Sequence, residues 1–184
     1  NTLVNNLLDM ARLESGKVIL NRQWQPIEEV VGSALRAIQP ILDKHSVKVA
    51  MDDDLPPVHI DAVLIERVLI NLIENAVKYT PQGTTIKLGA TATPDNIELW
   101  VADEGPGLPH GHEEAIFSKF MRGKKESSIP GVGLGLAICR AIAKAHGGTI
   151  LGVTRPEGGA RFTLRLPREE PPVIDPFDQK IDKE

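Results

Sequence analysis

The segment at residues 61–79 limits the fold most strongly, because its pattern gives a helix two faces of opposite character. At about 100° per residue, Asn71, Asn75 and Lys78 fall within an arc of about 60° on one side of that helix. An apolar stripe lies roughly a third of a turn away, formed by Ile65, Leu69, Leu72 and Ala76. The sequence therefore predicts a helix that packs one face on a core and keeps the other face polar.

The polar face carries side chains that suit a metal-bound polyphosphate. The amide oxygens of Asn71 and Asn75 are hard ligands of the kind Mg²⁺ accepts, and Mg²⁺ usually takes few protein ligands beside substrate phosphates and water. The ammonium of Lys78 supplies a point charge for phosphate oxygens. A helix face that is simply solvated would carry the same residues, so this segment alone leaves both interpretations open.

A glycine-rich turn follows a strand-like segment further along the chain. The alternating pattern of residues 96–103 ends at Asp103, and the chain then turns through Gly105 and Gly107. The Asp103 carboxylate stands at the end of the strand, where it can accept a hydrogen bond from the amino group of a base. This turn favours the nucleotide interpretation of the polar helix face.

A second glycine-rich segment opens a helical pattern that runs to His146 and contains Gly131, Gly133 and Gly135. Side-chain-free backbone at a helix N-terminus presents N–H groups to an anion. A tight loop packed against a neighbour would use the same glycines. A dinucleotide-binding fingerprint would follow an apolar strand directly, whereas residues 121–130 are polar and basic and indicate a mobile loop. No P-loop motif occurs in the chain.

In this order, the blocks resemble the ATP-binding domain of bacterial sensor histidine kinases, which belong to the ATPase superfamily shared with gyrase, Hsp90 and MutL. Residues 71–79 resemble its N box, 103–107 its first glycine box, 117–120 its F box, and 131–135 its second glycine box. Four blocks in one order are far more specific than any single block. Residues between the blocks resemble the branch of sensor kinases that regulates bacterial potassium uptake: 24–35, 66–79, 125–142 and 155–160.

The resemblance implies an α/β fold, a two-layer sandwich of the Bergerat type with a mixed sheet packed on helices. The periodicities agree, because helical and strand-like patterns alternate without a regular repeat. We expect helices at residues 26–43, 61–79 and 132–146, with Asp61 as the N-cap of the second helix. We expect strands at residues 17–22, 47–51, 85–93, 96–103, 149–154 and 160–166.

Three regions are expected along the chain. Residues 2–13 carry an apolar helical stripe without a partner of its own, and the resemblance makes residues 1–16 the end of the second helix of a dimerisation hairpin. Residues 17–167 would form the catalytic ATP-binding domain. Residues 168–184 are charged, contain three prolines, and are expected to be a disordered tail.

The resemblance also implies roles for individual residues. Asn75 would hold Mg²⁺, Asn71 and Lys78 would contact phosphate, Tyr79 would lie near the base, and Asp103 would accept from the adenine amino group. Gly105 and Gly107 would shape the nucleotide pocket, and Gly131, Gly133 and Gly135 would admit the phosphates.

Lys119 belongs to a group of cations that would face phosphate, and Arg122 is a candidate to stabilise charge on the transferred phosphoryl group. An exposed cation in the loop is the alternative interpretation of Arg122. For Phe117 and Phe120, the spacing of three suggests a structural role instead, in which both side chains anchor the loop to the core.

The chain departs from the family pattern at two points. Ala160 stands where relatives often place a Thr beside the adenine pocket, and its methyl group cannot make that hydrogen bond. The phosphoacceptor histidine is also missing, because none of the five histidines lies in the first helix of a dimerisation hairpin. The pair His110 and His112 would suit zinc only with a third ligand, which the neighbouring sequence does not offer.

Two functions remain open from the sequence. The first is the catalytic part of a histidine kinase, in which an imidazole attacks the γ-phosphorus of ATP bound with Mg²⁺. The second is an ATPase, or an ATP-binding regulatory module without kinase activity. Hydrolysing relatives activate water with a Glu one turn before the Asn that holds Mg²⁺, whereas Asn71 has no basic form at pH 7. This difference favours the kinase.

Composition fits one compact domain and limits the partners. The chain has 184 residues with a net charge of −4, which gives no nucleic-acid footprint. Its single cysteine, Cys139, excludes disulfides within the chain and lies in an apolar helical pattern. No apolar run approaches the roughly 20 residues that span a bilayer. We expect a soluble cytoplasmic domain of an inner-membrane sensor kinase that is a homodimer at full length. Its partners would be ATP or ADP, its own dimerisation domain and a response regulator.

Overall fold

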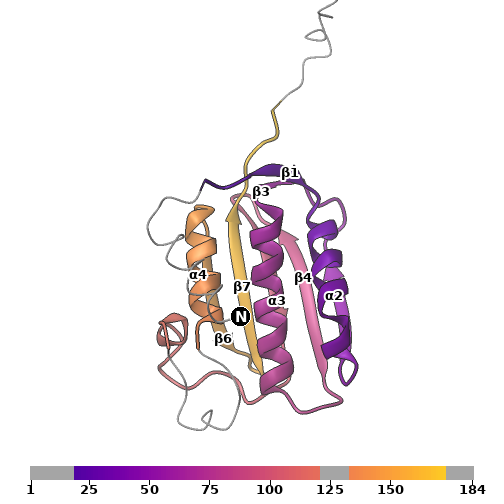
Figure 1. Cartoon of the computed structure of the whole chain (residues 1–184), viewed down its shortest axis with the longest axis vertical. Coiled ribbons are helices and arrows are strands. Elements are labelled where there is room, and N and C mark those ends of the chain that lie inside the picture. The colour runs from indigo at the N-terminus through magenta and orange to yellow at the C-terminus, as the bar shows by residue number, and fades with distance from the viewer. Residues whose placement is uncertain (1–18, 121–132, 173–184) are drawn as a thin grey trace, which may run out of the picture.

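The computed structural model describes residues 19–120 and 133–172 (Figure 1). A mixed sheet of five strands forms one layer, in the order β2-β4-β5-β7-β6, and helices α2, α3 and α4 cover one of its faces. The strands are β2 Ser46–Met51, β4 Thr85–Ala92, β5 Asn96–Ala102, β6 Thr149–Thr154 and β7 Ala160–Pro167. The helices are α2 Ile27–Leu42, α3 Ala62–Tyr79 and α4 Gly135–Ala145. The predicted two-layer α/β sandwich is confirmed.

The sheet is mixed because one of its pairs is parallel. Strand β2 runs parallel to β4, and the connection between them passes through α3, whereas β4, β5, β7 and β6 pair antiparallel in that order. Parallel neighbours need a long crossover, and antiparallel neighbours can be joined by short turns. Hairpins of this kind join β4 to β5 and β6 to β7.

Alternating residues of the central strands form the core under the helices. The inward-facing side chains are almost fully buried: Ile86, Leu88, Ile97, Leu99, Leu164 and Leu166. On the other face, the Trp100 ring lies over Gly89, where an added Cβ would stand 2.1 Å from Trp100 Cζ2. The Arg161 guanidinium stacks on that ring with its carbon 4.3 Å from the ring centroid. The period-2 pattern thus separates an apolar face from a mixed one.

Helix α3 forms where the sequence predicts, and both of its ends are capped. The Asp61 carboxylate accepts a hydrogen bond from the backbone N–H of Leu64 at 3.2 Å, as expected of an N-cap. At the other end, the Thr80 backbone N–H and hydroxyl both donate to the carbonyl of Ala76. The predicted apolar stripe of α3 is buried and includes Ile65, Leu69, Leu72 and Ala76. The stripe fixes which side of α3 faces away from the core.

Residues 19–22 do not form the strand predicted at 17–22, and residues 17–18 lie outside the described residues. The strand is instead β1 Gln23–Gln25, and it pairs antiparallel with β3 Val58–Ile60, which was not predicted. Residues 19–22 cannot join this ladder because β3 offers only three residues, and the Asn21 N–H instead donates to the Asp61 carboxylate at 3.0 Å. The pairing of β1 with β3 joins segments that are distant in sequence, so no local sequence pattern predicts it.

Helix α4 begins later than the predicted residue 132. Leu134 is its N-cap, and Gly133 before it has a φ of 71°, which lies outside the helical region. A short 3₁₀ helix, η1 Ala115–Phe117, was not predicted. The predicted helix at residues 2–13 lies outside the described residues.

Both ends of the described chain lie beside the small β1–β3 sheet. The Glu169 carboxylate contacts His59 Nδ1 at 2.9 Å and the Arg22 guanidinium at 3.7 Å. Trp24 stacks on the His59 ring with 5.0 Å between the centroids. The Arg168 backbone N–H donates to the carbonyl of Asp95, so these first residues of the predicted tail contact the domain. Among the described residues, no helix is long and apolar enough to cross a membrane.

A buried histidine joins the start of α3 to the end of α4. The side chain of His146 donates through Nδ1 to the carbonyl of Ile142 at 2.8 Å, and its Nε2 accepts from the Asp61 backbone N–H at 3.1 Å. Both ring nitrogens are thereby used by the neutral ring. Burial is the main cause that lowers the pKa of His146 from 6.5.

We expect the fold to lose stability in mild acid because of His146. Its pKa is lower in the folded state, so the unfolded chain binds the extra proton more readily, and the free energy of unfolding falls as the pH drops below about 6.5. Urea titrations at a series of pH values should show this decline, and His146→Gln should flatten it. His110→Gln, at an exposed histidine, is the matched control and should keep the decline. An unchanged slope in His146→Gln would contradict the prediction.

Candidate functional site

The polar face of α3 points away from the core. Asn71, Asn75, Lys78 and Tyr79 are all partly exposed, whereas the intervening Leu72, Ile73 and Ala76 are buried. The Lys78 ammonium lies 5.1 Å from the centroid of the Tyr79 ring. The structure therefore brings these four predicted site residues together on one side of the helix, toward its C-terminal end.

Asn71 lies against the N-terminal turn of α4. A Cβ added at Gly135 would stand 3.5 Å from Asn71 Oδ1, so the side chain reaches the first residue of that helix. The Nδ2 atom of Asn71 is buried and has no hydrogen-bond partner in the part of the chain that the structure describes. A buried donor without a partner is costly, and a phosphate oxygen would satisfy it. Asn71 thus offers a donor, not a base, between α3 and α4.

Cys139 of α4 also lies where α4 packs on α3, but it does not act as a nucleophile. Its thiol is fully buried and donates weakly to the Val68 carbonyl at 3.8 Å. Burial raises the pKa of Cys139 to about 12, although the neighbouring Asn71 side chain acts in the opposite direction. The thiol therefore stays protonated, in agreement with the predicted core role.

Asp103 is a buried residue whose two carboxylate oxygens differ in their hydrogen bonds. Its Oδ1 accepts from the backbone N–H groups of Gly105 at 2.8 Å and Ala160 at 3.0 Å. Within the described residues, no hydrogen bond from the protein reaches Oδ2. The side chain is thus oriented by two backbone donors on one oxygen, while the other oxygen is left for a ligand donor such as an amino group. Ala160 contributes through its backbone N–H, which any residue except proline would supply at this position.

Gly105 and Gly107 are needed because the turn after Asp103 runs between two other segments. A Cβ at Gly105 would stand 2.9 Å from the carbonyl oxygen of Tyr79, at the end of α3. Gly107 has a φ of 80°, and a Cβ there would stand 2.7 Å from the Thr154 side chain. The predicted base-binding turn therefore touches the polar end of α3 on one side and the β6–β7 turn on the other.

The two F-box phenylalanines differ in environment. Phe117 is buried, packs edge-on against Phe162 with centroids 6.3 Å apart, and is covered by the Arg140 guanidinium at 4.6 Å. Phe120 is 60% exposed, so it does not anchor to the core as predicted. Its backbone N–H instead donates to the Gly133 carbonyl at 3.0 Å, which joins the two ends of the segment 121–132.

The remaining predicted residues divide between exposed and undescribed positions. Lys119 is exposed and lies between the two phenylalanines in sequence. Arg122 and Gly131 lie outside the described residues, so their predicted roles stay predictions. Gly133 and Gly135 flank the N-cap of α4, beside Asn71.

A metal would have few protein ligands in the described region. Residues 19–120 and 133–172 contain no group of three His, Cys, Asp or Glu side chains that could hold one. The side chain of Asn75 makes no hydrogen bond within these residues, and its amide oxygen suits Mg²⁺ held largely by phosphates and water. The donor set therefore fits the magnesium expected from the sequence.

The residues that hold Asp103 from outside its own turn were not predicted. Arg155 and Gly159 contact the Asp103 carbonyl, and Thr154 Oγ1 accepts from the Leu108 N–H at 3.0 Å. The only signal was the conspicuous Arg-Pro-Glu-Gly-Gly segment at 155–159, which indicates a turn without naming its partner.

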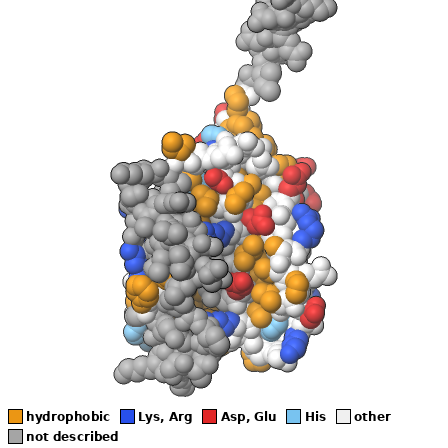
Figure 2. Space-filling model, in the orientation of Figure 1, with side chains coloured by type: hydrophobic (Ala, Val, Ile, Leu, Met, Phe, Trp, Pro, Cys, Tyr) orange, Lys and Arg blue, Asp and Glu red, His pale blue; other side chains and the backbone are white. Residues whose placement is uncertain are grey.

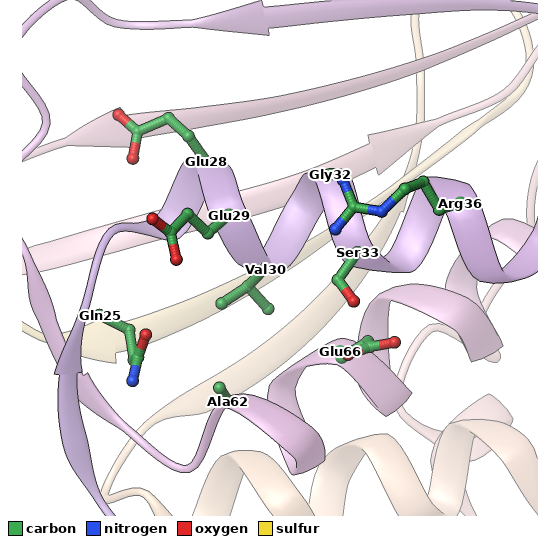
Figure 3. A pocket seen from close by; sticks show the side chains of 9 residues that line it. All are labelled: Gln25, Glu28, Glu29, Val30, Gly32, Ser33, Arg36, Ala62 and Glu66. Atoms are coloured by element: carbon green, nitrogen blue, oxygen red, sulfur yellow. The ribbon is translucent and has the colours of Figure 1, made fainter.

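Other hollows on the surface are remote from this site. Figure 3 shows a groove between α2 and the start of α3, lined by Glu28, Glu29, Arg36 and Glu66 among others. It lies at the end of α3 opposite Tyr79. On the visible part of the described surface, charged and apolar side chains are interspersed (Figure 2). The groove shares no residue with the predicted site on α3 and the turn after β5.

Comparison with known proteins adds independent information. Residues 60–170 match the family model described as histidine kinase-, DNA gyrase B-, and HSP90-like ATPase. The sensor protein KdpD of Escherichia coli (strain K12) is 52% identical over 179 residues, which are 97% of this chain and 20% of that protein. The chain thus corresponds to a small part of that relative.

Two solved structures extend the similarity to the fold. The Acinetobacter baumannii histidine kinase AdeS matches with a TM-score of 0.75 and 29% identity, over 90% of this chain and 77% of that chain. Full-length ShkA in complex with AMPPNP matches with a TM-score of 0.80 and 28% identity, over 90% of this chain and 35% of that chain.

Proposed function

The chain belongs to the histidine kinase-, DNA gyrase B-, and HSP90-like ATPase family, and we propose that it is the catalytic ATP-binding part of a sensor histidine kinase of the KdpD kind. In this role it binds ATP with Mg²⁺ and transfers the γ-phosphoryl group to a histidine on a dimerisation domain. The similarity to KdpD and to two histidine kinase structures supports the proposal.

The environment of Asn71 carries the choice of kinase over hydrolase. Its side chain lies beside the first turn of α4 with Oδ1 toward Gly135, and its buried Nδ2 is a donor without a partner in the described residues, which would bind a phosphate oxygen. A carboxamide cannot take a proton from water at neutral pH, so this position offers no general base for hydrolysis. This position therefore favours transfer to an external nucleophile, such as a histidine imidazole, over hydrolysis.

The other phosphate contacts follow from the same helix. Asn75 would contribute an amide oxygen to Mg²⁺ and Lys78 a positive charge to the phosphates. Bound Mg²⁺ would neutralise and orient the phosphates for in-line attack. Lys119, Arg122 and the glycines 131, 133 and 135 would face the phosphates from the other side, with Arg122 stabilising charge on the transferred group.

The base would bind at the turn after β5. The Oδ2 atom of Asp103 would accept from the adenine 6-amino group, because Oδ1 is already occupied by two backbone donors. Gly105 and Gly107 would leave room for the ring, and Tyr79 would lie beside it. The base and phosphate sites would thus be joined by the end of α3.

The wider context follows from the similarity to KdpD. We propose that the chain is the cytoplasmic part of a membrane sensor kinase that is a homodimer at full length. It would regulate potassium uptake by passing the phosphoryl group to a cognate response regulator related to KdpE. An ATPase or a regulatory module without kinase activity is the alternative, and it is favoured by the family's inclusion of gyrase- and HSP90-like ATPases.

Nucleotide titration tests the proposal directly. We expect the chain to bind ATP and ADP with Mg²⁺ and to turn ATP over very slowly by itself, because the site offers no hydrolytic base. Isothermal titration calorimetry measures the binding, and release of phosphate measures the turnover. Absence of binding to either nucleotide would contradict the proposal, and rapid hydrolysis would favour the ATPase.

A further inference from the structure

We propose that Arg155 is a positioning residue for nucleobase selection, because it fixes the adenine-reading carboxylate of Asp103 through the Asp103 main-chain carbonyl. This inference rests on the proposed function and deepens it. Arg155 lies just after β6, far from Asp103 in sequence, and no feature of the four family blocks includes it.

The contact between the two residues is short and sheltered. The NH1 group of Arg155 donates to the carbonyl oxygen of Asp103 at 2.7 Å, and the Arg155 side chain is only 12% exposed. Asp103 itself is 6% exposed. A hydrogen bond from a charged donor to a buried carbonyl is among the stronger ones in a protein, and its loss leaves the acceptor without solvent to replace the donor.

The β6–β7 turn also holds Asp103 at its other polar atoms. The Asp103 backbone N–H donates to the carbonyl of Ala160 at 2.9 Å, and the Ala160 N–H donates to Asp103 Oδ1. Gly159 packs so closely that an added Cβ would stand 1.9 Å from the Asp103 carbonyl oxygen. The N–H, the carbonyl and one carboxylate oxygen of Asp103 are therefore all bound to this turn, and Oδ2 is the atom that remains for the base.

Arg155 is itself held in place by the turn. Its Nε and NH2 groups both donate to Glu157 Oε1, at 3.1 Å and 2.5 Å. Its backbone N–H donates to the Gly159 carbonyl, and its own carbonyl accepts from the Gly158 N–H. Hydrogen bonding from the Arg155 side chain is also the main cause that lowers the pKa of Glu157. The guanidinium is thus oriented toward the Asp103 carbonyl without a bound nucleotide.

The consequence of removing Arg155 would be a change in selectivity. Without the guanidinium, the peptide between Asp103 and Glu104 loses the donor that fixes its orientation. The Oδ2 atom would then point less consistently at the 6-position of a purine. A general loss of stability would weaken the binding of every nucleotide equally. A loss of the carboxylate's orientation would weaken the binding only of nucleotides that carry a 6-amino group.

ADP and IDP provide the test, because they differ only in the amino or oxo group at the purine 6-position and in the proton that N1 carries beside the oxo group. The ratio of their dissociation constants, measured by calorimetry with Mg²⁺, reports how well the carboxylate reads that group. We expect the unmodified chain to prefer ADP by at least about tenfold, the usual effect of one hydrogen bond to a charged group. Arg155→Met should reduce this ratio to about threefold or less.

Arg165→Met is the matched control. Arg165 lies on β7 and pairs with Glu98 at 2.7 Å, so it also forms an Arg–Glu pair but is remote from Asp103. It should keep the ratio of the unmodified chain. If Arg155→Met weakened ADP and IDP equally and kept their ratio, Arg155 would be a structural residue and the inference would be overturned.

A second variant covers failure of the first to fold. Arg155→Gln keeps a polar side chain but removes the charged guanidinium that donates to the Asp103 carbonyl. It should reduce the ratio about threefold, and an unchanged ratio would overturn the inference. If the unmodified chain bound no ADP, the proposed function itself would fail. If it bound ADP and IDP equally, the adenine-reading role of Asp103 would fail, and the inference with it.

Discussion

Asn75→Ala is expected to reduce phosphotransfer to a supplied acceptor histidine by about 100-fold or more, since several kcal/mol of charge stabilisation depend on the metal. Asn75 is the residue proposed to place an amide oxygen on Mg²⁺. Transfer can be followed by labelling a separately produced dimerisation hairpin with radioactive ATP, and the product should be acid-labile and base-stable.

The fold should survive this substitution. The Asn75 side chain makes no hydrogen bond in the described residues and lies outside the buried stripe of α3. Alanine is also the better helix former. Thermal unfolding should therefore be unchanged or slightly raised. Gln39→Ala is the matched control, because it removes an exposed carboxamide from α2 and should leave transfer intact. Normal transfer by Asn75→Ala, or loss caused by unfolding, would refute the metal-holding role.

Asp103→Asn should weaken ADP binding by about tenfold or more, the cost of losing a hydrogen bond to a charged group. The structure determines how the new amide lies. The N–H groups of Gly105 and Ala160 both point at Oδ1, so the amide oxygen must take that position and the NH₂ group must replace Oδ2. Two donors would then face each other at the adenine amino group.

The same geometry predicts a reversal of selectivity in Asp103→Asn. The amide NH₂ can donate to the 6-oxo group of IDP, so this variant should prefer IDP to ADP when both are titrated. Asp103→Ala is the comparison: it leaves the two backbone donors without an acceptor, and it should lower the melting temperature as well as the affinity. Unaltered ADP affinity in Asp103→Asn would show that another group reads the base.

Local patterns predicted the elements whose determinants are local. Helix α3 has an apolar period, an N-cap and a polar end within one segment, and its predicted bounds agree with the structure to within one residue. Strand β3 has only three residues and exists through pairing with β1, which is distant in sequence. The start of α4 was predicted too early because a glycine with positive φ interrupts a pattern that otherwise suits a helix.

The candidate site divides in the same way. The sequence predicted that Asn71, Asn75 and Lys78 share a helix face, and the family model confirms the resemblance on which their roles were based. The roles of the individual residues stay predictions. The support of Asp103 by Arg155 could not be predicted, because it depends on the approach of two turns, and neither turn carries a periodic signal.

The joining of Arg22, His59 and Glu169 at the β1–β3 end has a mechanical consequence. The incoming and outgoing chain are fastened at one end of α3, while Lys78 and Tyr79 stand at the other end, about 27 Å away for a helix of this length. A rigid rotation of the domain by about 20° about this fastened end would carry the other end of α3 through about 9 Å. A bound phosphate could travel that distance without any rearrangement inside the domain.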